Sequence, residues 1–370
     1  MKTIPRYFQE IPAISFISAF FIRTVKFPSN YIFLDSARSS IKWILSQISR
    51  SYERKLIIGI PCYSCASILH AIVDSDNEPQ LIDINPLDFT ISNEIIDSIS
   101  NLDVLIWINF FGLKYPVILK LIRARLPNLI IIEDCSHVDL RDYQNQNKEE
   151  LYSDYLIFSF NFRKPITAGG GGLLIFNETR NGPLNIRIRA LYNTLTSSKL
   201  TIYMIINILI NNYSYNRFFF GLFNKLIAYK RNNTRILKSS SIKIFSMNGY
   251  LKKLFFSQFL NSSIKTNLVL STLNYFNNIK ANVNYFSFGT LYYFPVPIKS
   301  ISNNSKYKKI DTFILWNNLK LNYKLYNIDV SEHIYPRTFK FFNESLFYPA
   351  EFFNECNNMI IDWFTSVSKF

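Results

Sequence analysis

Cysteine is scarce in this sequence, whose 370 residues include only Cys62, Cys65, Cys135 and Cys356. Four cysteines are too few for a disulfide scaffold in a chain of this length, so we expect a reducing, cytoplasmic environment. Cys62 and Cys65 form one C-x-x-C pair, and no second pair is present to complete a zinc site. A redox role would require that pair to open a helix beside a thioredoxin-like unit. We favour neither interpretation and predict no metal site.

Long apolar runs are lacking as well. The apolar segment 11–22 is preceded by only Lys2 and Arg6, has no small-residue cleavage site after it, and is too short to span a bilayer. It therefore predicts neither a signal peptide nor a transmembrane helix. Segment 200–210 is also apolar and too short, and basic residues follow it. We favour a buried helix with a basic end. The alternative is a helix that contacts the inner face of the membrane through residues 200–231.

Acidic residues are in the minority, because 26 Asp and Glu face 41 Lys and Arg and give a net charge of +15. Such a surplus favours an anionic partner, which would be a nucleotide-linked substrate, a nucleic acid or an acidic membrane face. A solvated basic surface explains the charge equally well. The sequence contains no basic arm, zinc finger or recognition-helix motif, so we predict no nucleic-acid partner.

Glycine and alanine are sparse, whereas 48% of the residues are hydrophobic and 16% are aromatic. That apolar content supplies a large core, and 370 residues are more than one ordinary domain holds. We predict a large α/β domain at residues 1–240 and a smaller C-terminal α+β domain at residues 241–370. In the small domain we expect a strand at 290–296 and helices at 307–319 and 352–364.

Short apolar runs alternate with stretches of helical spacing in the first half of the chain. We expect strands at residues 31–34, 55–60, 80–84, 104–110, 129–133, 155–160 and 172–176. Continuous apolar strands separated by helices are typical of a mostly parallel central sheet flanked by helices on both faces. Ligands bind at the carboxyl ends of the strands in such sheets, so the residues that follow each strand are the candidates for chemistry.

Polar groups follow four of these strands, at residues 36–39, 61–65, 133–137 and 159–164, and the last group leads into glycines 169–172. In order and spacing these segments resemble the motifs of the DegT/DnrJ-type sugar aminotransferases. Those are fold-type I enzymes that depend on pyridoxal phosphate (PLP), and the resemblance covers about residues 30–180. It implies the same fold and the same cofactor here.

The resemblance also implies roles for two catalytic residues. Lys164, in S-F-N-F-R-K, matches the lysine whose amine forms an imine with the cofactor aldehyde and then moves protons as a general acid-base. Asp134, in E-D-C-S-H, matches the acid that keeps the pyridine nitrogen protonated, so that the ring can accept electrons. Alone, such residues are more often a surface lysine and a strand cap, and their joint order is what favours the family.

Five further positions are implied to bind the cofactor. Ala37 and Arg38 would offer backbone amides to its phosphate at a helix N-terminus, and Ser159 would offer a hydroxyl. Cys65 matches a turn that supplies a neighbour to the ring, and His137 lies close to the ring in the family and is our third catalytic candidate. A neighbouring subunit usually completes the phosphate site, and Asn248 is the one stand-in for its asparagine that we identify.

We therefore predict a homodimeric PLP-dependent aminotransferase that aminates a nucleotide-linked keto sugar, with glutamate as donor, in surface polysaccharide or glycan biosynthesis. Two alternatives remain open. One is a PLP-dependent sugar dehydratase, although relatives of that type usually have histidine at the position of Lys164. The other is a catalytically inactive PLP-fold protein with a regulatory or membrane-associated role in assembly.

Overall fold

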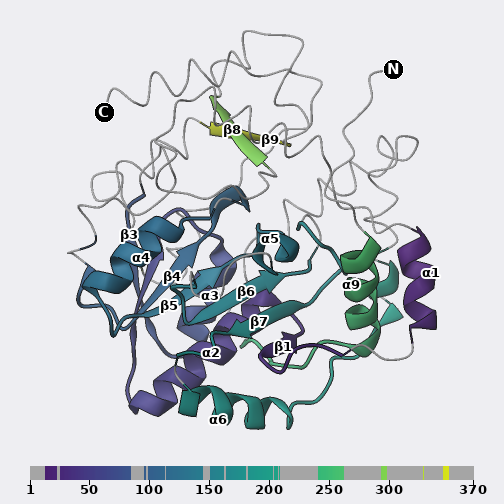
Figure 1. Cartoon of the computed structure of the whole chain (residues 1–370), viewed down its shortest axis with the longest axis horizontal. Helices are drawn as coiled ribbons and strands as arrows, with labels where there is room; N and C mark the ends of the chain where they lie inside the picture. Colours follow the sequence, from purple (N-terminus) through teal and green to yellow (C-terminus); the bar gives the residue numbers. More distant parts are fainter. Residues whose placement is uncertain are drawn as a thin grey trace.

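In the part of the chain that the structure describes, seven strands form the main sheet, in the order β1-β7-β6-β5-β4-β2-β3 (Figure 1). The computed structural model describes residues 13–22, 26–84, 96, 99–112, 114–144, 151–161, 164–180, 182–202, 204–206, 208, 241–261, 293–297, 328 and 345–349. The strands are β1 (Tyr31–Leu34), β2 (Ile57–Pro61), β3 (Glu78–Ile82), β4 (Val104–Ile108), β5 (Ile130–Asp134), β6 (Tyr155–Ser159) and β7 (Gly172–Phe176).

The sheet is mostly parallel, as the apolar pattern predicts. Strands β6, β5, β4, β2 and β3 pair in parallel, whereas β7 pairs antiparallel with both β1 and β6. Six of the seven strands therefore run in one direction, and their carboxyl ends meet at one edge. This arrangement brings residues that are far apart in the sequence to the same place.

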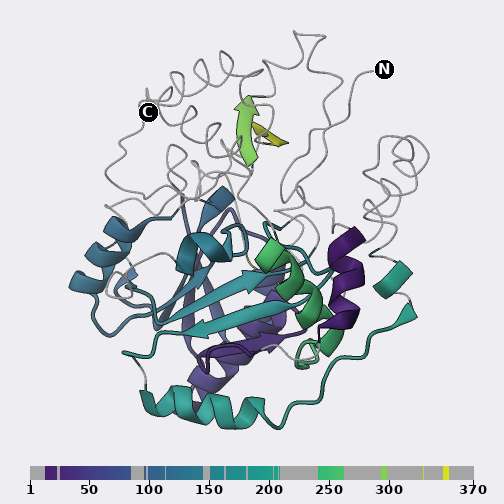
Figure 2. The ribbon, with the colours of Figure 1, turned by 45° about the vertical axis from the view of Figure 1, so that its right-hand side comes forward.

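Helices cover both faces of the sheet (Figure 2). Ile32 and Leu34 of β1 pack in one core cluster, and Phe33 between them packs in another, because successive side chains of a strand point to opposite faces. The first cluster includes residues of α2 (Ala37–Tyr52), α3 (Ala66–Asp74), α4 (Pro116–Arg125) and α6 (Gly182–Tyr192). The second includes residues of α1 (Ala13–Phe21), α5 (Leu140–Gln144) and α9 (Gly249–Asn261).

Part of the C-terminal region is also described. Strands β8 (Tyr293–Pro297) and β9 (Ser345–Pro349) pair antiparallel, and β8 agrees with the strand that we expect at 290–296. The helices expected at 307–319 and 352–364 lie outside the described residues. Helix α9 follows the predicted boundary at residue 240, yet it packs against α1 beside the large sheet. The division at residue 240 stays a prediction.

Close contact between β7 and the start of α2 makes Gly172 a sensitive position. A Cβ atom on Gly172 would lie 2.5 Å from the backbone carbon of Ser36 and closer still to the nitrogen of Ala37. Both neighbours are backbone atoms and cannot move aside as a flexible side chain could. The substitution Gly172→Ala should therefore lower the free energy of unfolding by about 3 kcal/mol and weaken the binding of PLP. Urea denaturation and PLP titration measure the two effects. Gly182→Ala is the control, since nothing lies within 4 Å of its added Cβ, and equal losses in both variants would contradict this account.

Candidate active site

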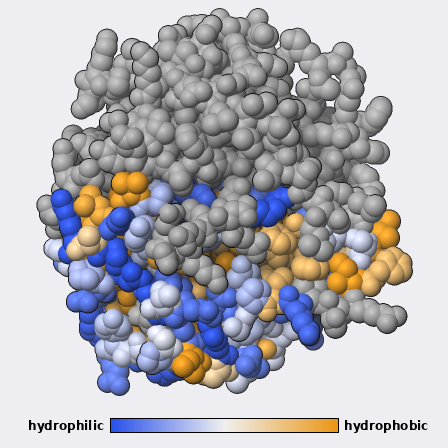
Figure 3. Space-filling view, viewed as in Figure 1, coloured by the Kyte–Doolittle hydropathy of each residue, from blue (hydrophilic) through white to orange (hydrophobic). Residues whose placement is uncertain are grey.

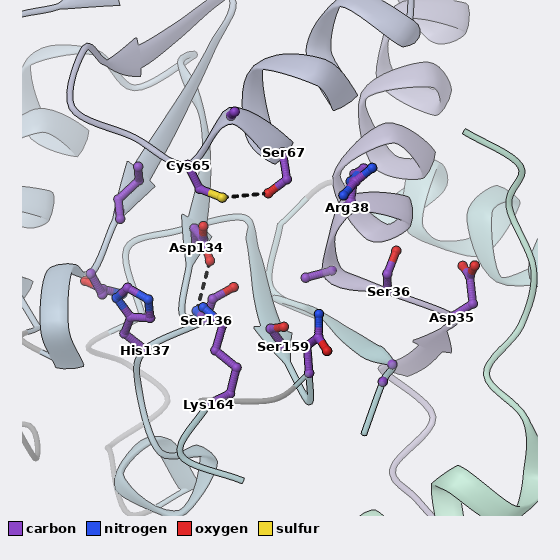
Figure 4. Close-up of a pocket in the computed structure, with 17 residues that line it drawn as sticks. Asp35, Ser36, Arg38, Cys65, Ser67, Asp134, Ser136, His137, Ser159 and Lys164 are labelled. Carbon is purple, nitrogen blue, oxygen red and sulfur yellow. Dashed lines mark hydrogen bonds between the residues drawn. The ribbon is translucent and has the colours of Figure 1, made fainter. Parts of the chain in front are cut away.

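A cavity of about 390 Å³ opens at the carboxyl ends of β4, β5 and β6, beside the N-termini of α2 and α3 (Figure 4). The seven residues that the sequence predicts to be catalytic or to bind the cofactor from within the same subunit all line this cavity. They are Ala37, Arg38, Cys65, Asp134, His137, Ser159 and Lys164. The structure thus brings together positions that span more than a hundred residues of sequence.

Asp134 and Lys164 both line the cavity. Asp134 ends β5 and is only 8% exposed, and its Oδ1 accepts a hydrogen bond from the Ser136 amide at 2.9 Å. Figure 4 shows the Lys164 side chain pointing from the loop after β6 toward Ser136 and Asp134. Burial lowers the pKa of the Lys164 amine, although the charges of Asp134 and Cys65 act in the opposite direction. A lowered pKa leaves more of the amine neutral and able to attack a carbonyl carbon.

His137 borders the cavity as a neutral imidazole. Burial, together with the charge of Lys164, holds the pKa of His137 well below its usual value. A positive charge on His137 would lower the pKa of the Lys164 amine further, and the neutral ring has no such effect.

The depressed pKa of His137 predicts a loss of stability in acid. Below the unfolded-state value of about 6.5 the unfolded chain takes up a proton at His137 that the folded protein does not. The free energy of unfolding should therefore fall with decreasing pH by up to about 1.4 kcal/mol per unit from this group. Urea denaturation of the wild type and of His137→Gln between about pH 5 and pH 7.5 tests this, because the variant lacks the titrating ring. A difference in stability that does not change with pH would refute the prediction.

The start of α2 forms one edge of the cavity. Ser36 caps the helix, since its Oγ accepts a hydrogen bond from the Ser39 amide at 3.1 Å. The next two residues, Ala37 and Arg38, line the cavity with the positive end of the helix dipole. Ser159, at the end of β6, reaches the same space. This edge could therefore hold a phosphate group.

The residues present fit PLP, and the glycine turn contributes to the fit. Gly171 has a φ of +105°, which side-chain-bearing residues rarely adopt, and a Cβ there would collide with Met247. Glycine at this position therefore lets the turn form part of the cavity wall without a side chain that would collide with Met247. An acid, a lysine, a hydroxyl and a helix N-terminus around one cavity are the groups that could hold the ring nitrogen, the aldehyde and the phosphate of this cofactor.

Sequence reasoning missed Asn109, which follows β4 and lines the cavity. Its Nδ2 donates to Glu133 Oε2 at 2.9 Å and to Cys135 Sγ at 3.3 Å, while its buried Oδ1 has no hydrogen-bond partner among the described residues. The strand-end rule that selected Asp134 could also have selected Asn109. The cavity contains Asp35, Ser67, Ser136 and Asn161 as further polar residues that were not nominated.

Asn248, our stand-in for the phosphate-site asparagine, has a different role within its own chain. Its Oδ1 accepts from the Tyr250 amide and its Nδ2 donates to the Ser198 carbonyl oxygen, each at 2.9 Å. It caps the start of α9 and is not among the cavity residues.

Neither cysteine of the C-x-x-C pair forms a disulfide bond. Cys62 is buried, and Cys65 stands at the start of α3 with its Sγ 3.0 Å from Ser67 Oγ. Within the described part of the chain, no group of three or more His, Cys, Asp or Glu residues could hold a metal ion.

Comparison with known proteins gives one family match and many structures of similar fold. Residues 34–197 match the model of the DegT/DnrJ/EryC1/StrS aminotransferase family. A putative sugar aminotransferase from Streptococcus pneumoniae, solved in its pyridoxamine phosphate form, superimposes with a TM-score of 0.62 at 12% identity, over 99% of this chain and 100% of that one. No curated protein matches the sequence.

Two further solved structures share the fold. Sugar aminotransferase CalS13 from Micromonospora echinospora has a TM-score of 0.62 at 12% identity and covers 94% of each chain. Helicobacter pylori PseC, an aminotransferase involved in the biosynthesis of pseudoaminic acid, has a TM-score of 0.59 at 13% identity, over 99% of this chain and 100% of that one. The mostly parallel sheet with its flanking helices is therefore the fold of these aminotransferases.

Proposed function

We propose that this chain, whose residues 34–197 match the model of the DegT/DnrJ/EryC1/StrS aminotransferase family, transfers an amino group from glutamate to a keto sugar carried on a nucleotide. PLP is the cofactor of the family. The observation that carries the proposal is the position of Lys164 beside Asp134 in a cavity that also contains a helix N-terminus. Glutamate would leave as 2-oxoglutarate, and the sugar carbonyl oxygen would be replaced by the amino group.

Bound PLP would supply an aldehyde that accepts the amino group and a ring that withdraws electrons from the carbon that loses a proton. Asp134 would hold the ring nitrogen protonated. The Lys164 amine, whose pKa is lowered by burial, would bond to the aldehyde at rest and then move the proton between carbons. Ala37, Arg38 and Ser159 would bind the phosphate, and Cys65 and His137 would border the ring.

The finer parts of the proposal rest on charge and on analogy. A net charge of +15 suits a substrate that bears a diphosphate. We propose a cytoplasmic homodimer that serves surface polysaccharide or glycan biosynthesis, by analogy with Helicobacter pylori PseC, which is involved in the biosynthesis of pseudoaminic acid. The lysine at position 164 favours amino transfer over the dehydratase alternative, for which histidine is usual.

The test is to incubate the purified protein and PLP with glutamate and a panel of nucleotide-linked keto sugars. We expect 2-oxoglutarate to be released in the presence of one of these sugars, together with the corresponding amino sugar. Sugars lacking the nucleotide serve as matched controls, because they keep the reacting carbonyl and lose the diphosphate. Equal rates with free 2-oxo acids as acceptors would contradict the sugar assignment.

A further inference from the structure

Helix α1 turns an apolar side outward. Ile17, Phe20 and Phe21 are 57%, 64% and 78% exposed, and their spacing of three and four residues places them on one side of the helix. Its other side is anchored, because Ala19 is fully buried and Ser18 Oγ lies 2.6 Å from Ser257 Oγ of α9. A surface helix ordinarily shows the opposite pattern, with polar residues outward.

A second element beside α1 has the same property. Residues 202, 204–206 and 208 are helical, and Ile202 and Ile206 are 76% and 46% exposed. Ile208 is buried in the core cluster that contains Ala19, which joins this element to α1 (Figures 1 and 2). Figure 3 shows orange side chains over the α1 side of the molecule. We call the outward residues of the two elements the apolar patch; they are Ile17, Phe20, Phe21, Ile202 and Ile206.

Two of the patch residues, Ile202 and Ile206, lie in a stretch of the sequence with an unusual charge. Residues 179–310 contain 19 Lys and Arg and no Asp or Glu. The rest of the chain holds the other 22 of the 41 basic residues and all 26 acidic residues. The whole positive surplus therefore comes from the stretch that contains Ile202, Ile206 and α9. Exposed lysines also stand close to the patch in sequence, since Lys26 follows α1 and Lys199 precedes Ile202.

We infer that the apolar patch docks on the surface of an anionic membrane. Apolar side chains enter the boundary between headgroups and acyl chains, and nearby Lys and Arg are attracted by negative headgroups. A second copy of this chain fits less well, because the exposed Lys26 and Lys199 of one copy would face the same lysines of the other and repel them. The contact is interfacial, as no helix in the described part of the chain is long and apolar enough to cross a membrane.

Vesicle sedimentation of the full-length protein tests the lipid surface. We expect binding to vesicles that contain phosphatidylglycerol in phosphatidylcholine. Binding to vesicles of phosphatidylcholine alone should be weaker by about tenfold or more, because these vesicles carry no net negative charge. Binding should fall at about 0.5 M salt, because screening weakens the attraction of the basic residues. Equal binding to both kinds of vesicle, or none to either, overturns the inference.

Variants locate the contact. The double variant Phe20→Ser, Phe21→Ser should lower partitioning by about tenfold, and Ile202→Ser on the neighbouring element should lower it by a smaller factor. Ile186→Ser is the matched control, since Ile186 is 70% exposed on α6 and lies outside the patch. Circular dichroism and the thermal midpoint establish that the variants are folded. Unchanged partitioning of the folded variants overturns the inference. So does a change from dimer to monomer in the double variant without a change in vesicle binding, because the patch would then be a contact between subunits.

Discussion

Replacing Lys164 by alanine should lower the rate of amino transfer by about 10⁴-fold, because the substitution removes both the amine that bonds to the cofactor and the base that moves the proton. Burial lowers the pKa of this amine, and the side chain points toward Asp134 in the cavity. No other lysine lines that cavity in the part of the chain that the structure describes. We therefore expect no other lysine of the cavity to replace Lys164 in the reaction.

Release of 2-oxoglutarate measures the loss in Lys164→Ala, and borohydride reduction of the wild type with PLP should fix the cofactor mass at Lys164. Lys164→Arg keeps a cation and should be as inactive as the alanine variant, because a guanidinium stays protonated and does not attack the aldehyde. Lys120→Ala, which alters an exposed lysine on α4, should behave as the wild type. A borohydride-fixed mass at a different lysine would assign the reaction to another site.

The sequence predicts the sheet well because most of its strands are buried on both faces, β3 being the exception. Strands of that kind are continuous apolar runs, as at Val104–Ile108, where all five residues are buried. Strand β3 begins two residues earlier than expected, at Glu78, since its bounds follow from pairing with Ile57–Pro61 of β2. Strand β9 was not predicted. It is a short segment bounded by Pro349, and its pairing with β8, some fifty residues earlier, is what defines it.

The site is predictable to the extent that it lies at strand ends. The carboxyl ends of parallel strands share one edge, so Asp134 and Ser159 could be placed together from their positions at the ends of β5 and β6. Asn109 obeys the same rule, but its importance comes from its hydrogen bond to Glu133, 24 residues away, which spacing does not reveal. The outward orientation of Phe20 and Phe21 also depends on what α1 packs against, and an apolar run in the sequence ordinarily predicts burial.

Asp134→Asn should lower amino transfer by about 10³-fold while leaving the protein folded. The amide has the size of the carboxylate and can still accept the hydrogen bond from the Ser136 amide, so the local structure has no reason to change. What is lost is a negative charge fixed in a buried place, and charges of that kind contribute two to three orders of magnitude in rate. The ring nitrogen of PLP would no longer be held protonated, and its capacity to accept electrons would fall.

The same substitution should move the titration of Lys164. The charge of Asp134 raises the pKa of the Lys164 amine against the effect of burial, so the neutral amide should let that pKa fall further. The pH at which borohydride-fixed labelling of Lys164 reaches half its maximum should therefore be lower in Asp134→Asn than in the wild type. Asp76→Asn is the control, because Asp76 is exposed and its φ of 61° is one that asparagine also adopts. A variant that keeps wild-type transfer and an unshifted labelling curve would show that Asp134 does not face the cofactor.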